Sequence, residues 1–208
     1  MKFTQGYWMI KQNYIMSYAT HAVRVNKTDK AMQVLSACRP ITNRGAILDG
    51  GTLTVTFTAP RANIIRVKVT HFAGTKVRDP KFETYEEDVT PVIEENEEYA
   101  SFTSGELTAR VTKACGQWMV EYMVGDKVIT STGWRGMGRA LAKDGTEVSL
   151  LPHGKSFMSD SLQLDVGEYV YGLVSASARM SRTARASICG TRTAARPPSW
   201  RTRTSPST

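Results

Sequence analysis

The strongest candidates for catalytic or ion-binding side chains are carboxylates, which occur in two clusters. The first cluster is Glu86, Glu87 and Asp88, and the second is Glu94, Glu95, Glu97 and Glu98. Carboxylates serve as general acids or as calcium ligands, but a calcium loop needs oxygen ligands at alternating positions and a glycine that turns the chain. Neither cluster has that spacing. Adjacent carboxylates at strand ends usually face water, where they discourage edge-to-edge pairing of sheets. We therefore expect both clusters to be solvated.

Histidine and cysteine, the other common residues of catalytic and metal sites, are spread singly along the chain. They are His21, His71, His153, Cys38, Cys115 and Cys189. No histidine has a partner at the spacing of metal ligands, and an odd number of distant cysteines gives no disulfide framework. His71 falls on the apolar side of an alternating run, which favours a core histidine over a catalytic one. The thiols indicate a reducing compartment, and we expect a cytoplasmic location.

A glycine-rich run, GWRGMGR at positions 133–139, has the glycines and cations of a phosphate cradle. It lacks the strand-to-helix context that would aim a helix N-terminus at an anion, so we interpret residues 133–146 as a flexible loop. No nucleophile elbow, Walker loop or dinucleotide fingerprint is present. We therefore assign no catalytic, cofactor-binding or metal-binding residue, and we expect no cofactor.

The segments that must position these residues show apolar and polar side chains in alternation, with the two-residue period of β-strands. Apolar side chains alternate with threonine from Leu53 to Phe57, where Pro60 closes the run. Alternation recurs in residues 65–71, 107–111, 118–122 and 161–173. Residues 114–117 and the pair Gly125-Asp126 have the composition of hairpin turns, and residues 74–88 resemble a surface excursion. Many short strands without a helical stripe predict an all-β protein, an antiparallel β-sandwich.

The charge distribution divides the chain in two. The last acidic residue is Glu168, and residues 174–208 contain seven arginines and no lysine. We expect one domain over residues 1–173 and a disordered Arg/Ser/Thr-rich tail over residues 174–208, because the tail buries too little apolar surface to offset its ordering entropy. No apolar run is long enough for a membrane span, and the N-terminus is unlike a secretory signal.

Several word-like segments of the first part carry a family resemblance. They are MKFTQGYWMI at the start, ITNRGAILDG at 41–50, LTVTF at 53–57 with Pro60, IIRV at 64–67, HFAG at 71–74, Pro80 with Phe82, and Tyr171-Gly172-Leu173. Together they resemble the N-terminal domain of bacterial α-xylosidases of glycoside hydrolase family 31, whose YGLGER junction begins with the last of them. The resemblance implies a galactose mutarotase-like β-sandwich over residues 1–173.

The family pattern stops after Leu173, and a shift of reading frame accounts for the break. Residues 188–195, back-translated with chosen codons and read two bases later, give MWNEDGG. Residues 200–208 give AYKNIPFY in the same way, and residues 180–186 can give VKNGQS. In α-xylosidases the strings VKNGQS, MWNEDGG and AYKNIPFY follow the YGLGER junction in that order, which is also their order along this chain. We therefore hypothesise a small insertion or deletion near codon 174 and a tail that is translated out of frame.

The resemblance implies a retaining glycosidase that acts on α-linked xylose, such as isoprimeverose or xyloglucan fragments. In this family the catalytic carboxylates lie in a (β/α)8 barrel that follows the sandwich, and the sequence ends before any barrel. We therefore expect a fragment that is inactive alone. Its partners in the intact enzyme, expected to be a homo-oligomer, would be its own barrel and an α-xyloside, with no membrane and no specific nucleic acid.

Two other functional classes stay open at this stage. A stand-alone carbohydrate-binding sandwich would use an exposed aromatic ring, Trp118 or Trp134, as a sugar platform, although each is more often a core residue. An RNA-binding protein would use the arginines of the tail, which contact phosphates through counterion release. These arginines are Arg179, Arg182, Arg185, Arg192, Arg196, Arg201 and Arg203.

Overall fold

The computed structural model describes residues 4–5, 9–48, 50–71, 85–142 and 156–164. These residues form antiparallel strands and one short 3-10 turn, η1 (Arg44–Ile47), and there is no α-helix among them. The prediction of an antiparallel all-β protein is therefore confirmed. The proposed tail, residues 174–208, lies outside the described residues. No helix in the described part has the length and apolar character that a membrane crossing requires.

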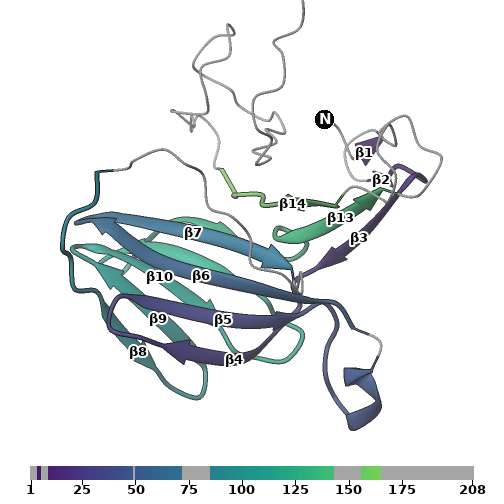
Figure 1. Ribbon diagram of the computed structural model, residues 1–208, viewed down its shortest axis with the longest axis horizontal. Helices are drawn as coiled ribbons and strands as arrows, with labels where there is room; N and C mark the ends of the chain where they lie inside the picture. Colours follow the sequence, from purple (N-terminus) through teal and green to yellow (C-terminus); the bar gives the residue numbers. More distant parts are fainter. Residues whose placement is uncertain (1–3, 6–8, 49, 72–84, 143–155, 165–208) are drawn as a thin grey trace, which may run out of the picture.

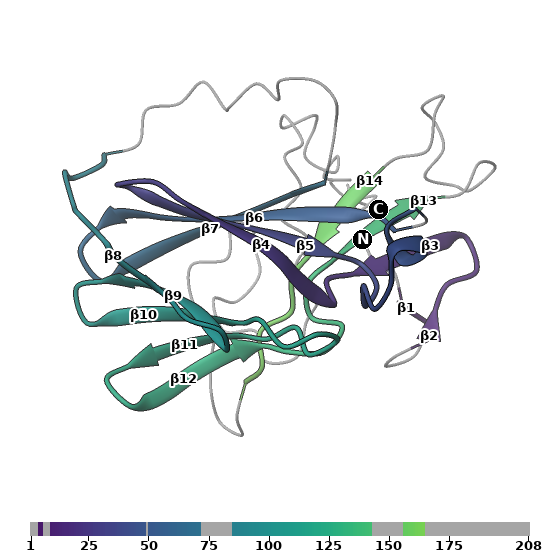
Figure 2. The same cartoon turned by 90° about the horizontal axis from the view of Figure 1, so that it is seen from below.

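Two sheets stacked face to face form the sandwich, as the two views show (Figures 1 and 2). The first sheet runs in chain order through β4 (His21–Lys27), β5 (Ala31–Ala37), β6 (Thr52–Arg61) and β7 (Ile64–His71). The second sheet also follows chain order, through β8 (Val92–Glu95), β9 (Tyr99–Ser104), β10 (Leu107–Thr112), β11 (Val120–Val124) and β12 (Lys127–Thr132). Both sheets are thus meanders, in which sequence neighbours pair.

A third, smaller sheet joins distant parts of the chain at one end of the sandwich (Figure 1). Its central strand is β13 (Gly138–Ala142), which pairs with β14 (Ser156–Ser159) and with β3 (Tyr14–Tyr18). Gly138 lies opposite Tyr18 in this pairing. A short ladder of β1 (Thr4–Gln5) and β2 (Met9–Ile10) precedes it. The N-terminal segment is thereby brought beside the residues that follow β12.

The core lies between the two large sheets and follows from the strand alternation. Leu53, Val55 and Phe57 of β6 are at most 1% exposed, whereas the threonines between them are half-buried. Phe57 meets Phe102 of β9 across the layers, with ring centroids 6.4 Å apart. Burying one such ring contributes about 2–3 kcal/mol, and β-branched threonine suits the wetter face of a pleated sheet.

The β6–β7 hairpin of the first sheet and the β9–β10 hairpin of the second sheet are joined by hydrogen bonds between their turns. Asn63, in the β6–β7 turn, has a left-handed φ of 61° and accepts the Glu106 N–H at Oδ1, 2.7 Å away. The Asn63 N–H donates to the Ser104 carbonyl (3.2 Å). Gly105 also has a left-handed φ, and a Cβ there would lie 2.1 Å from Asn63 Oδ1. Only glycine fits this close approach.

The predicted turns of the second sheet are confirmed. Gln117 N–H donates to the Ala114 carbonyl (3.1 Å), which closes the turn between β10 and β11. Val124 pairs with Lys127, so Gly125 and Asp126 form a two-residue hairpin loop. Gly125 has φ 55°, the left-handed conformation that the first position of a type II′ turn requires.

Three predicted boundaries are wrong. Pro60 does not close its strand: β6 continues to Arg61 through an irregular register between Thr58 and Arg61, where a missing N–H is tolerated. Residues 133–146 are not one flexible loop, because positions 138–142 form β13. The strand expected over 161–173 is replaced by β14 at 156–159. Residues 161–164 are not strand, and positions 165–173 lie outside the described part.

Candidate functional site

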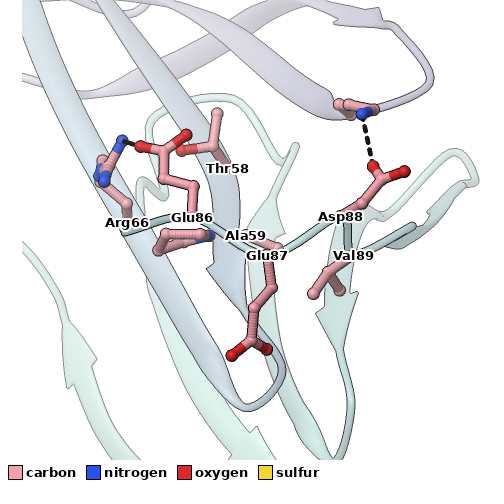
Figure 3. A pocket seen from close by; sticks show the side chains of 9 residues that line it. Thr58, Ala59, Arg66, Glu86, Glu87, Asp88 and Val89 are labelled. Carbon is pink, nitrogen blue, oxygen red and sulfur yellow. Dashed lines mark hydrogen bonds and ion pairs between the residues drawn. The ribbon is translucent and has the colours of Figure 1, made fainter. Parts of the chain in front are cut away.

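The first acidic cluster lies along a hollow at one end of β6 and β7 (Figure 3). Its volume is about 410 Å³, and its lining is Lys30, Thr58, Ala59, Pro60, Arg66, Glu86, Glu87, Asp88 and Val89. The Glu87 N–H donates to the Pro60 carbonyl (2.8 Å), so the bulged end of β6 anchors the acidic segment. The hollow is therefore bounded by a strand irregularity on one side and by carboxylates on the other.

Each carboxylate of this cluster has a cationic partner on a neighbouring strand or hairpin. Glu86 lies 2.8 Å from Arg66, Glu87 lies 3.4 Å from Arg61, and Asp88 accepts a hydrogen bond of 2.6 Å from Lys30. The Lys30 hydrogen bond and charge lower the pKa of Asp88. These side chains are exposed, as predicted, but they are paired with cations. A lowered pKa is the opposite of what a general acid needs at neutral pH.

The second cluster contains one paired carboxylate. Glu95 lies 3.1 Å from Lys27 and 3.0 Å from Lys113, and hydrogen bonds from Lys113 and Lys27 lower its pKa. Lys27 belongs to the first sheet and Glu95 to the second, so this triad connects the layers. The other members, Glu94, Glu97 and Glu98, are exposed, as predicted.

A cysteine and a histidine meet although the sequence gives no sign of it. The Sγ atom of Cys115 lies 3.4 Å from Nδ1 of His21, 94 positions away. The Ile41 N–H also donates to this nitrogen (3.3 Å). Nδ1 is therefore an acceptor, and the imidazole proton sits on Nε2. The Ile41 N–H competes with the thiol for the single lone pair of this nitrogen. The contact links three segments of the chain, and we assign it no catalytic role.

The remaining histidines give no site. His71, at the end of β7, is half-buried, and burial together with the nearby charge of Arg139 lowers its pKa. It is thus at the rim of the core, where a core position was expected. His153 lies outside the described residues. Within the described part, no three side chains of His, Cys, Asp or Glu are grouped to hold a metal ion.

A polar cluster that the sequence did not indicate lies next to the core at the end of β12. The Thr132 hydroxyl donates to Asp160 Oδ1 (3.0 Å). Desolvation raises the pKa of Asp160, although hydrogen bonds from Thr132 and the Ser161 backbone oppose the change. Burial and the Asp160 charge also raise the pKa of Tyr122. Asp160 is thus a carboxylate with a raised pKa, although the residue as a whole is exposed.

The two candidate sugar platforms differ sharply in exposure. Trp118 is 4% exposed and belongs to the core, so its interpretation as a platform is wrong. Its indole N–H has no hydrogen-bond partner in the described structure. Trp134 is 77% exposed, contrary to the expectation that it is more often a core residue. It occupies the turn between β12 and β13.

This turn, residues 133–136, is closed by a hydrogen bond from the Gly136 N–H to the Gly133 carbonyl (2.9 Å). Arg135 has a left-handed φ of 57°, an uncommon conformation for a residue with a Cβ. Its guanidinium lies 4.2 Å from the centre of the Trp134 ring and 5.9 Å from that of Tyr18. The Arg135 charge opposes the rise that burial causes in the pKa of Tyr18. Among the described residues no helix N-terminus adjoins this turn, so the helix-based form of a phosphate cradle is not found here.

The fold and the geometry place this protein in the class of antiparallel β-sandwiches. Its surface carboxylates form salt bridges, and the turn at residues 133–136 exposes an aromatic ring. No protein-family model matches the chain. Two curated relatives are similar to it: Alpha-xylosidase XylQ of Lactiplantibacillus pentosus and Alpha-xylosidase of Emericella nidulans. Each is 27% identical, over 173 and 185 aligned residues respectively.

The matches are unequal in coverage. Each includes 83% of this chain but only 21% of the first relative and 24% of the second. The chain therefore spans about a fifth to a quarter of the length of the curated relatives it matches. The resemblance to α-xylosidases is confirmed, and the coverage fits an N-terminal fragment of such an enzyme.

Proposed function

We propose that this chain is the N-terminal β-sandwich of an α-xylosidase of glycoside hydrolase family 31, and that it supplies structure to the enzyme without supplying the catalytic carboxylates. The observation that carries the proposal is the coverage of the matches: most of this chain aligns with a small part of each α-xylosidase. The rest of such an enzyme would provide the barrel and the site for an α-linked xyloside.

The carboxylates of the sandwich support the proposal. A retaining glycosidase needs two carboxyl groups about 5–5.5 Å apart, one acting as nucleophile and the other, with a raised pKa, as general acid. The paired carboxylates Asp88 and Glu95 have lowered pKa values. Desolvation raises the pKa of Asp160, and the two neighbours that act on it, Thr132 and the Ser161 backbone, oppose that rise; neither of them is a second carboxylate.

An activity assay on the full 208-residue chain tests this proposal. We expect no release of nitrophenol from p-nitrophenyl α-D-xylopyranoside above the buffer rate, with a complete α-xylosidase as the positive control. Turnover by the chain alone would contradict the proposal. If turnover occurs, Asp160→Asn identifies its source: loss of activity with an unchanged melting temperature would place catalysis in the sandwich.

The proposal includes an out-of-frame origin for residues 174–208. Supporting it are the absence of acidic residues after Glu168 and the α-xylosidase-like strings that a shifted frame yields. Sequencing the gene across codons 165–210 is the direct test. A frame corrected by one or two bases that continues with MWNEDGG and AYKNIPFY is expected, and a verified frame that encodes the tail as written would contradict it.

A further inference from the structure

We propose that the turn at residues 133–136 presents a sugar-binding subsite, in which Trp134 is the stacking platform and Arg135 supplies hydrogen-bond donors to a neutral pyranoside. The choice of α-xylosides as the sugar class rests on the proposed function, but the subsite itself rests on the geometry of the turn. Hydrolysis is not required for it.

The Trp134 ring is exposed to solvent. An isolated exposed apolar residue needs no explanation, but an indole that is 77% exposed leaves out of the core the largest apolar side chain available. The other tryptophan in the described part, Trp118, is 4% exposed. The apolar C–H face of a pyranose suits the electron-rich face of an aromatic ring, and an exposed ring keeps such a face accessible.

The turn that carries the Trp134 ring is held in place. A Cβ at Gly136 would lie 2.6 Å from Thr132 Cγ2 and 3.2 Å from the Ser161 carbonyl, and a Cβ at Gly133 would lie 3.0 Å from Gln163 Nε2. The turn is therefore packed directly on the segment that contains Ser161 and Gln163. An exposed ring on a packed turn loses little conformational freedom when it binds a ligand.

That supporting segment is itself fixed to β12. The Gln163 N–H donates to the Ser131 carbonyl (2.8 Å), and the Ser131 hydroxyl donates to Gln163 Oε1 (2.9 Å). The Thr130 hydroxyl donates to the Gln163 carbonyl (2.7 Å). Three hydrogen bonds thus fix the segment on which the turn packs, so the conformation of the turn is set by the sandwich and not by a ligand.

Arg135 supplies hydrogen-bond donors next to the ring. The Arg135 guanidinium lies over the Trp134 ring at 4.2 Å and makes no ion pair with any described residue. It offers a planar set of N–H donors beside an aromatic face. A sugar presents an apolar face bordered by hydroxyl acceptors, so one ring and one adjacent guanidinium can recognise both. A single cation without a second basic partner is a weak site for an anion.

Titration of the full chain with methyl α-D-xylopyranoside and isoprimeverose, followed by tryptophan fluorescence and ligand-observed NMR, tests the proposal. We expect weak, saturable binding with a Kd in the millimolar range for the unmodified chain. Trp134→Ala should weaken it at least tenfold, and Trp134→Phe should restore most of it. Arg135→Gly should weaken it several-fold while the chain stays folded, because glycine suits the left-handed φ.

The matched control is Tyr85→Ala, which removes the other exposed ring that carries an arginine: Tyr85 is 73% exposed and Arg61 lies 4.4 Å from its centre. It should leave binding unchanged. Equal loss in both variants, unchanged binding in Trp134→Ala with an unchanged melting temperature, displacement of the sugar by inorganic phosphate, or no binding by the unmodified chain would each overturn the subsite. These outcomes are separate from those of the xyloside-hydrolysis assay, which tests the proposed function.

Discussion

Two exposed aromatic rings of this sandwich each carry an arginine, yet their surroundings are opposite in kind. Arg61, which lies over Tyr85, is also 3.4 Å from Glu87, and Glu86 and Asp88 pair with cations on a neighbouring strand and hairpin turn. Arg135, over Trp134, has no carboxylate partner among the described residues, and the turn beneath it is held by close glycine contacts. We call these the Tyr85 stack and the Trp134 stack.

The difference shows two ways of fixing a surface segment. At the Tyr85 stack the cation is neutralised by a neighbour, which leaves little reason for a ligand to bind. At the Trp134 stack the backbone is held by packing and hydrogen bonds, so the guanidinium and the ring stay available. Exposed ion pairs contribute little and depend on salt, whereas an extra group forced into a tightly packed site costs about 1–3 kcal/mol.

The largest expected effect is at the packing of the Trp134 stack. Gly136→Ala should lower the free energy of unfolding by about 2–3 kcal/mol, because the new Cβ would lie 2.6 Å from Thr132 Cγ2. Gly125→Ala is the control: no atom lies within 4 Å of its Cβ, and only the left-handed φ of 55° opposes it, at roughly 1 kcal/mol. Urea unfolding measures both. Equal losses would mean that packing does not hold the turn.

The second-largest expected effect is the loss of an ion pair. Glu95→Gln should lower the free energy of unfolding at pH 7 by about 1 kcal/mol. Lys113 and Lys27 lower the pKa of Glu95 in the folded state, so the stabilisation is present above the ordinary glutamate pKa. It is lost as the pH falls through the folded value. The deficit of the variant should therefore vanish in acid, and it should shrink in high salt.

The matched control for this experiment is Glu94→Gln, an exposed neighbour with no ion pair among the described residues. Urea titrations of both variants at pH 7 and pH 3 give the comparison. A deficit of the Glu95 variant that persists at pH 3 would show that the residue acts through packing and not through charge.

Local features of the fold could be predicted from the sequence, and long-range ones could not. Phe57 was expected to face inward because alternation with threonine is a local pattern, and Gly125-Asp126 was expected to turn because its chemistry is local. Arg135 of the Trp134 stack also lies 5.9 Å from the centre of the Tyr18 ring, and Tyr18 is near it because β3 pairs with β13 across most of the chain. The ion pairs of the acidic segment could not be predicted from the sequence either, because their cations lie on three other parts of the fold.

The smallest expected effect distinguishes the two arginines by the sign of a glycine substitution. At Arg135, glycine should be more stable than alanine by about 1 kcal/mol, because a Cβ is disfavoured at φ 57°. At Arg61, a strand residue of β6, alanine should be more stable than glycine by roughly 0.5–1 kcal/mol, because glycine loses more backbone freedom on folding. Both variants of a pair lack the guanidinium, so the comparison isolates the backbone. Melting curves of the four proteins give the answer, and the same sign at both positions would mean that Arg135 does not keep its left-handed conformation in solution.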